Sequence, residues 1–193
     1  MIDDKALDLL FRRARSPRTW LGGPVGAETL EAAYDLARMG PTSANCSPAR
    51  FVFVTSEDGK EKLKPCLAEN NVEKVLTAPA TAIIGYDLAF YEHLPRLYPF
   101  ADAKAWFEGN DELIEETAFR NGSLQGAYFI MACRALGLDC GPMSGFDNAA
   151  VDAAFFEGTT VRSNFICSIG EGDLAALAPR APRFDFDEAC SFA

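Results

Sequence analysis

The alternation of apolar and polar residues predicts a helix at the start of the chain. Leu7, Leu10, Phe11 and Ala14 recur with helical spacing on one face. Asp3 precedes them, and its carboxylate can accept hydrogen bonds from the free N–H groups of the first turn. The pattern therefore predicts a helix from about residue 3 to residue 14.

A second helix and a first strand follow. The helical pattern of residues 27–39 ends at Gly40 and Pro41, because glycine suits a helix C-cap and proline cannot continue the helix. Residues 51–55 are aromatic and β-branched, which is typical of a buried strand. The loop between the two elements is short and rich in small polar residues.

The middle of the chain alternates in the same way. Residues 59–76 predict two short helices that separate near Pro65, and residues 80–86 predict a second buried strand. Residues 87–110 contain aromatic residues and prolines without a clear period. We expect this segment to form a lid or a pair of helices packed at one edge.

The strongest helical pattern covers residues 112–136 and ends at Gly137. A short helix is expected to begin near Asp147, and residues 163–170 predict a third strand before a proline-rich tail. Long helical segments between few strands indicate an α+β fold or a three-layer packing of helices around a small sheet. We expect residues 1–193 to form a single domain.

Composition narrows the functional classes. The chain carries a net charge of −10, which argues against nucleic acid binding, because that function draws on clustered positive charge. The longest apolar stretch is interrupted and far shorter than the roughly 20 residues that cross a membrane. The acidic start does not resemble a secretory signal. We therefore expect neither a nucleic acid partner nor a membrane segment.

The six cysteines form no Cys-x-x-Cys pair, and we expect free thiols in the reducing cytoplasm. His93 is the only histidine, so zinc sites and a Ser-His-Asp hydrolase have little support. P-loop, dinucleotide-binding glycine, zinc-protease and nucleophile-elbow motifs are absent from the sequence.

Four segments could bind a ligand. Residues 12–18 contain four arginines, which suit phosphate, although a solvated helix end explains them equally well. Residues 40–48 and 141–147 are loops of small residues, and ordinary turns are the alternative in both cases. Residues 179–183 hold two arginines between prolines in the tail, and a plain surface tail is the alternative.

In this order and spacing, the segments resemble the FMN-dependent nitroreductase-like family over nearly the whole chain. The matching stretches are Arg15-Ser16-Pro17-Arg18-Thr19-Trp20, Pro41-Thr42-Ser43-Ala44-Asn45-Cys46-Ser47-Pro48, Asn71 ahead of Leu76-Thr77-Ala78, Ala135-Leu136-Gly137-Leu138 with Pro142-Met143-Ser144-Gly145-Phe146-Asp147, and Arg180. Within the family, the chain most resembles the malonic semialdehyde reductases of pyrimidine degradation. It departs from the family at three positions, Ala14, Ser47 and Ala178, where many members have arginine, glutamine and lysine.

The resemblance implies the nitroreductase-like α+β fold, with a small, largely antiparallel mixed sheet surrounded by helices. It also implies a cytoplasmic homodimer with FMN at the interface, NADPH or NADH as the hydride donor, and a small-molecule acceptor. It implies that no side chain is an essential catalyst, because the flavin carries the hydride chemistry. The FMN-binding residues that the resemblance implies fall into three groups. The phosphate and ring oxygens are bound by the basic, serine-containing segment and the tail, at Arg15, Ser16, Arg18 and Arg180. The ring is positioned by the polar side chains of Thr42, Ser43, Asn45, Ser47 and Asn71, and the backbone of Pro142, Met143, Ser144 and Gly145 contacts the flavin N5 edge.

Three activities stay open at this point. The first is reduction of malonic semialdehyde to 3-hydroxypropanoate, for which Arg50 and Arg120 are candidates to hold the acceptor carboxylate. The second is a broad nitro or quinone reductase. The third, suggested by Ala14 and Ala178, is a flavin-binding protein without catalysis. The sequence does not discriminate between NADH and NADPH.

Overall fold

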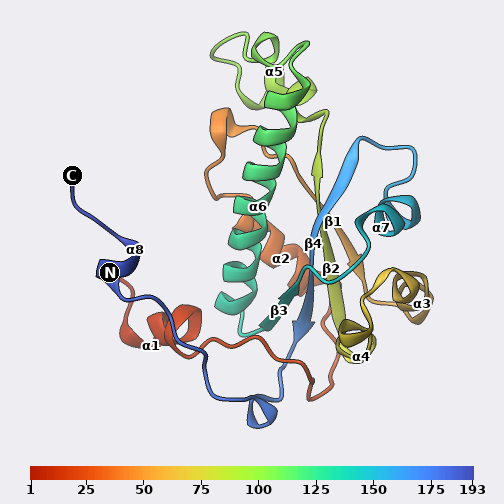
Figure 1. Cartoon of the computed structure of the whole chain (residues 1–193), viewed down its shortest axis with the longest axis vertical. Coiled ribbons are helices and arrows are strands. Elements are labelled where there is room, and N and C mark those ends of the chain that lie inside the picture. The colour runs from red at the N-terminus through yellow and green to blue at the C-terminus, as the bar shows by residue number, and fades with distance from the viewer.

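Four strands form one sheet in the computed structural model, which describes residues 1–193 (Figure 1). Their order is β1-β2-β4-β3, and every neighbouring pair is antiparallel. The α+β class and the antiparallel character predicted from the sequence are confirmed, and the sheet contains no parallel pair. The strands are β1 (Ala49–Val54), β2 (Ala80–Asp87), β3 (Asp139–Met143) and β4 (Val161–Gly170).

Alternate residues of the central strands face two separate layers of core. On β2, Ile84 packs in the cluster under α2 (Ala27–Ala37) and α6 (Asp111–Ala135), whereas Ile83 packs in a second cluster with α3 (Glu57–Leu63). All eight residues of β2 are buried, because helices cover both of its faces.

The second layer is completed by two further helices. α4 (Glu69–Thr77) contributes Val75 and α7 (Asn148–Phe155) contributes Val151, both fully buried. A third cluster, around Phe90, packs beneath the short helices of residues 87–110, of which α5 (Leu94–Leu97) is one.

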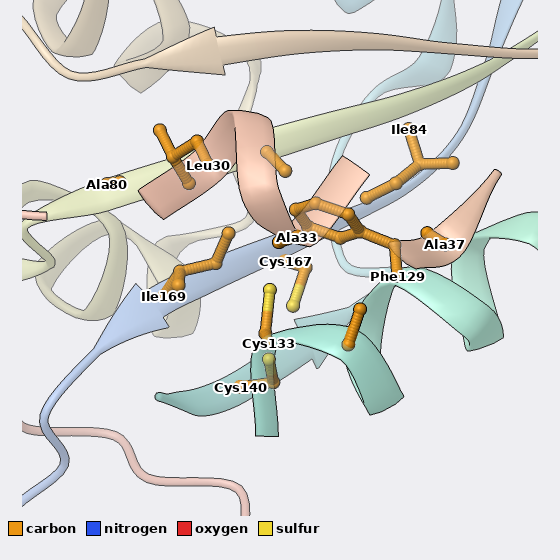
Figure 2. Close-up of a cluster of buried hydrophobic side chains, with 12 residues drawn as sticks. Leu30, Ala33, Ala37, Ala80, Ile84, Phe129, Cys133, Cys140, Cys167 and Ile169 are labelled. Atoms are coloured by element: carbon orange, nitrogen blue, oxygen red, sulfur yellow. The ribbon is translucent and has the colours of Figure 1, made fainter. Parts of the chain in front are cut away.

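Three cysteines meet in the core beneath α6. Cys133 at the end of α6, Cys140 on β3 and Cys167 on β4 are fully buried, and their sulfurs lie near one another (Figure 2). Hydrogen bonding to Cys140, together with burial, raises the pKa of Cys133 and of Cys167, so both thiols are neutral. All six cysteines are free, as expected.

The sequence prediction missed β3, because Gly141 and Pro142 resemble a turn. At the N-terminus, Asp3 caps the first helix as predicted, but regular α-helix covers only α1 (Asp4–Leu7) and a π-helical turn continues to Arg12. The chain ends in the exposed short helix α8 (Phe186–Ala189), next to α1 in the view of Figure 1. None of the helices is both long enough and apolar enough to cross a bilayer.

Candidate functional site

Four of the residues predicted to bind FMN line one cavity of about 820 Å³ between the segment after α1 and the C-terminal tail. These four are Arg15, Ser16, Arg18 and Arg180. No acidic residue lines the cavity, although the chain as a whole carries a net charge of −10. We call this space the arginine cavity, and its charge suits a phosphate group.

The walls of the arginine cavity hold each other in place through arginine side chains. Arg15 Nη2 donates a hydrogen bond to Ala178 O over 2.6 Å, and Arg180 Nη2 donates to Ala14 O over 2.7 Å. A guanidinium has several N–H donors, so each arginine keeps donors for a ligand while it fixes the backbone. The two segments are 163 to 166 residues apart in sequence, which is why sequence pattern alone does not join them.

Lys74, on the buried face of α4, links the arginine cavity to β3. A Cβ atom built on Gly141 would lie 2.5 Å from Lys74 Cε and 3.0 Å from Pro17 O, so three segments meet there. The Lys74 amine makes no hydrogen bond or ion pair within the chain. Burial lowers the pKa of Lys74, and the nearby Arg18 lowers it further. A buried, unpaired cation of this kind fits an electron-rich ligand.

Asn71 lies one helical turn before Lys74 and contacts the next part of the predicted site. Its Nδ2 donates to Gly145 O over 2.9 Å, and the same oxygen accepts from Ala68 N over 3.0 Å. A Cβ on Gly145 would lie only 2.5 Å from Asn71 Nδ2, so this glycine is required for the close approach of α4. Asn71 Oδ1 remains free to accept a hydrogen bond from a ligand.

Pro142, Met143 and Ser144 line a second hollow, of about 480 Å³, between β3 and α6. Gly145 follows directly, and its carbonyl is bound as described above. The α6 residues that line the hollow are Ser123, Ala127 and Ile130, which share one helical face. Asn71, Lys74, the end of β3 and the arginine cavity therefore form one continuous region, which we call the β3 side.

The remaining predicted residues lie in the loop of residues 41–48, which has an unusual backbone. Ala44, Asn45 and Ser47 have positive φ angles of 47°, 51° and 41°, a region costly for residues other than glycine. The surrounding structure must therefore hold the loop. Cys46 is fully buried beneath it, and burial raises the pKa of this thiol to about 11.

Side chains of α6 make hydrogen bonds that fix the backbone of the 41–48 loop. Asn121 Oδ1 accepts from Ser43 N over 2.8 Å, and Tyr128 Oη donates to Pro41 O over 3.0 Å. Within the loop, Thr42 Oγ1 accepts from Ser47 N over 3.2 Å. Gln125 Oε1 accepts from Ala49 N, just beyond the loop, over 2.8 Å. The three α6 residues, Asn121, Gln125 and Tyr128, are four and three positions apart and so lie on one face of the helix.

α6 therefore separates the two halves of the predicted site within one chain. Asn121, Gln125 and Tyr128 face the 41–48 loop, whereas Ser123, Ala127 and Ile130 face the β3 side. A step of two residues rotates the position around a helix by about 200°. The structure brings together Arg15, Ser16, Arg18, Arg180, Asn71 and residues 142–145, but not Thr42, Ser43, Asn45 and Ser47.

Two basic residues at the β3 side were missed in the sequence analysis. The sequence pattern did not distinguish Lys74 from the other polar residues of an amphipathic helix. Its position one helical turn after Asn71 could have indicated that it lies at the same site. Arg134, near the end of α6, lines the arginine cavity; its Nη1 donates to Leu10 O over 3.0 Å, and its buried Nε has no partner. Nothing in the local pattern distinguishes Arg134 from a surface arginine.

Two further arginines, Arg134 and Arg183, line the arginine cavity with Ala14, whereas Arg12 pairs with Asp4 over 2.8 Å and does not line it. Of the two arginines considered for an acceptor carboxylate, Arg50 pairs with Asp87 over 2.6 Å and Arg120 pairs with Glu116. Neither is a free cation.

Comparison with known proteins shows the family of this chain. The family model described as "Nitroreductase family" matches residues 11–170. A protein of Burkholderia lata, provisionally named as an NADH dehydrogenase/NAD(P)H nitroreductase, is 62% identical over 97% of this chain and 96% of its own length.

Solved structures show the same fold. A nitroreductase-type protein of Bacillus subtilis superposes with a TM-score of 0.90 at 24% identity, covering 99% of this chain and 100% of the other. An Exiguobacterium sibiricum protein, solved in complex with FMN, gives a TM-score of 0.86 at 19% identity over 100% and 99% of the two chains. On the family match and the close relative, the chain belongs to the nitroreductase family.

Proposed function

We propose that the protein is an FMN-dependent oxidoreductase that takes hydride from NADPH or NADH and passes it to a small acceptor. The observation that carries the proposal is the continuous β3 side, where an acid-free arginine cavity adjoins an unpaired buried lysine and a free amide oxygen. FMN carries a phosphate at one end and a heteroatom-rich ring at the other, and this set of cations and one acceptor matches both ends.

The arginine cavity would hold the phosphate. Arg15, Arg18 and Arg180 present guanidinium groups to one space, and Ser16 adds a hydroxyl there. The orphaned Nε of Arg134 is consistent with an anion partner for that side chain. Because the cavity walls are already fixed by the Arg15 and Arg180 hydrogen bonds, little ordering is needed on binding.

The ring would lie along the end of β3. Lys74 would place positive charge beside the ring where negative charge develops on reduction, and Asn71 Oδ1 would accept from a ring N–H. The backbone of residues 142–145 would flank the reactive edge, as the family resemblance implies. Bound FMN would supply the hydride transfer itself, so these residues position and tune it.

The 41–48 loop would reach the ring of a second copy. Within one chain, α6 stands between this loop and the β3 side, so a shared contact requires a homodimer with FMN at the interface. Exposed apolar residues support such an interface: Phe119 and Leu124 on α6 are 50% and 41% exposed, and Phe186 in the tail is 56% exposed. Thr42, Ser43, Asn45 and Ser47 would then complete the partner's site.

For the acceptor, we propose malonic semialdehyde, on the subfamily resemblance described above. A broad nitro or quinone reductase is the second candidate, and the name of the Burkholderia relative favours it. Both activities use the same flavin and differ only in the final acceptor. We place the enzyme in the cytoplasm, in keeping with its six free thiols, and we regard residues 1–193 as one domain.

The test is a visible spectrum of the purified protein, taken before and after anaerobic addition of NADPH or NADH. A yellow protein that bleaches on addition supports the oxidoreductase. Malonic semialdehyde and a quinone, added in turn, then show which acceptor restores the colour. A protein that binds FMN without bleaching would point to the non-catalytic alternative, and one that binds no FMN would refute the proposal.

A further inference from the structure

A second basic cavity lies on the other side of α6, next to the 41–48 loop. It measures about 630 Å³, and Asn45 and Ser47 of the loop form part of its wall. Four side chains that can carry positive charge line it and no acidic side chain does, in a chain whose net charge is −10. The four are Arg38, Arg50, His93 and Arg96.

Two of these cations are already paired. Arg50 Nη2 contacts Asp87 Oδ2 over 2.6 Å and Arg50 Nη1 donates to Ser47 O over 3.1 Å, so this side chain holds the loop. Arg38 pairs with Asp35 one helical turn away, over 2.9 Å. The charges of both arginines are therefore already balanced by carboxylates.

Arg96 and His93 are not paired. Neither side chain makes an ion pair or a hydrogen bond, and both are exposed at the cavity. The nearest acid along the chain, Glu92, contacts Lys104 over 2.7 Å and is thereby neutralised. Two free donors on successive turns of one short segment can hold the two oxygens of an anion.

The cavity is tied to the proposed flavin site through Asn45. Asn45 Nδ2 donates to Leu97 O over 2.9 Å, so the residue beside Arg96 is fixed to the loop that would contact the partner's flavin. Tyr34 and Phe51, whose rings meet edge to face at 5.8 Å, give the same cavity an apolar wall. An apolar surface beside a free guanidinium and a free imidazole suits a small organic acid.

We propose that Arg96, assisted by His93, binds the carboxylate of the acceptor and makes the enzyme selective for anionic acceptors. The inference rests on the proposed function, because it assigns the acceptor site of that reaction. A phosphate could use the same donors, and the 2′-phosphate of NADPH is the alternative source. If the site binds the acceptor carboxylate, loss of Arg96 should affect the reaction with NADPH and with NADH alike. If it binds the 2′-phosphate, the loss should be confined to NADPH.

The experiment compares Arg96→Gln with the wild type and with Arg162→Gln, which removes one charge from an exposed position outside both basic cavities. Flavin content is measured first, from the visible spectrum. KM and kcat are then measured for 4-nitrobenzoate and for the neutral 4-nitrobenzamide, each with NADPH and with NADH. Arg96→Lys is included, because it restores charge without the planar fork.

We expect Arg96→Gln to keep its flavin and its kcat, and to raise KM for 4-nitrobenzoate about tenfold, the factor that one charge-assisted hydrogen bond provides. KM for the amide should stay within about twofold, and Arg96→Lys should recover part of the loss. Equal losses for both acceptors, no loss for either, or a loss confined to NADPH would overturn the assignment. A wild type without flavin would instead refute the proposed function, and the inference with it.

Discussion

Lys74 occupies the space that a side chain on Gly141 would need: a Cβ there would lie 2.5 Å from Lys74 Cε and 2.9 Å from Lys74 Nζ. The absence of a side chain at Gly141 therefore allows Lys74 to pack against β3. The fit places a cation from α4 directly against the strand along which we propose that the flavin ring lies.

Gly141→Ala should displace Lys74 and weaken FMN binding. The new Cβ would also lie 3.0 Å from the backbone oxygen of Pro17, so the substitution overpacks this point, at a cost of about 1–3 kcal/mol. We expect a lower melting temperature and roughly tenfold weaker FMN binding, measured by quenching of flavin fluorescence. Gly26→Ala is the matched control, because no atom lies within 4 Å of its Cβ position. Unchanged FMN affinity in Gly141→Ala would contradict the role given to Lys74.

Lys74→Met should stabilise the FMN-free protein and weaken its binding of FMN. Burial lowers the pKa of Lys74 from its ordinary value of 10.5, so the charged amine destabilises the folded chain. Removing it should raise the melting temperature of the FMN-free protein by about 2–4 °C, which corresponds to about 1 kcal/mol, and weaken FMN binding.

The pH dependence of stability provides a second check on Lys74. Between its lowered folded pKa and 10.5, the unfolded chain holds a proton that the folded chain has released, so folding stability rises with pH in this window. Chemical unfolding at a series of pH values should show this rise in the wild type and a smaller rise in Lys74→Met. Equal slopes in the two proteins would be inconsistent with a buried, unpaired amine.

Arg180→Ala should show whether the arginine cavity binds the phosphate of FMN rather than its ring. We expect FMN affinity to fall about ten- to a hundredfold, as for a lost charge-assisted pair, while riboflavin, which has no phosphate, binds as before. The Arg180 hydrogen bonds to Arg12 O and Ala14 O also disappear in this variant. A tail that merely loosens would weaken both ligands equally, so the ratio of the two affinities is decisive. Arg162→Ala serves as the charge control.

Asn121→Leu should release the 41–48 loop. Asn121 is fully buried, and its Oδ1 and Nδ2 bond Ser43 N and Thr117 O over 2.8 and 2.9 Å. Leucine leaves Ser43 N without a partner, at a cost of about 1–3 kcal/mol. We expect a lower melting temperature and faster proteolysis within residues 41–48, mapped by mass spectrometry. Ser123→Ala, on the opposite face of α6, should leave the loop protected.

The sequence predicted the elements with strong periodicity and missed those set by distant contacts. The long helix, the strand around Ile83 and the helix that begins near Asp147 follow from local pattern, and the structure confirms them. The strand β3 was missed, because pairing with β4 overrides the turn preference of Gly141 and Pro142.

For the site, local motifs identified the arginine segment, residues 142–145 and Asn71, which the structure brings together. They could not reveal that Arg15 and Arg180 meet across the fold, or that α6 divides the site, because both depend on tertiary packing. Lys74 and Arg134 escaped notice for the same reason: burial and missing partners are not visible in the sequence.

The central claim is that one FMN site combines the β3 side of one chain with the 41–48 loop of another. Its most direct test is the FMN content of a mixed dimer, purified through two different affinity tags. One chain carries Arg15→Ala and Arg180→Ala. The other carries Ser43→Ala and Asn45→Gly, a glycine because Asn45 has a φ of 51°.

Each altered chain alone should form dimers with little or no FMN. In the mixed dimer, one site combines both defects and the other combines both unaltered halves, so the account predicts about one FMN per dimer. If each site were built within a single chain, both sites would be defective. A mixed dimer without FMN would therefore contradict the account.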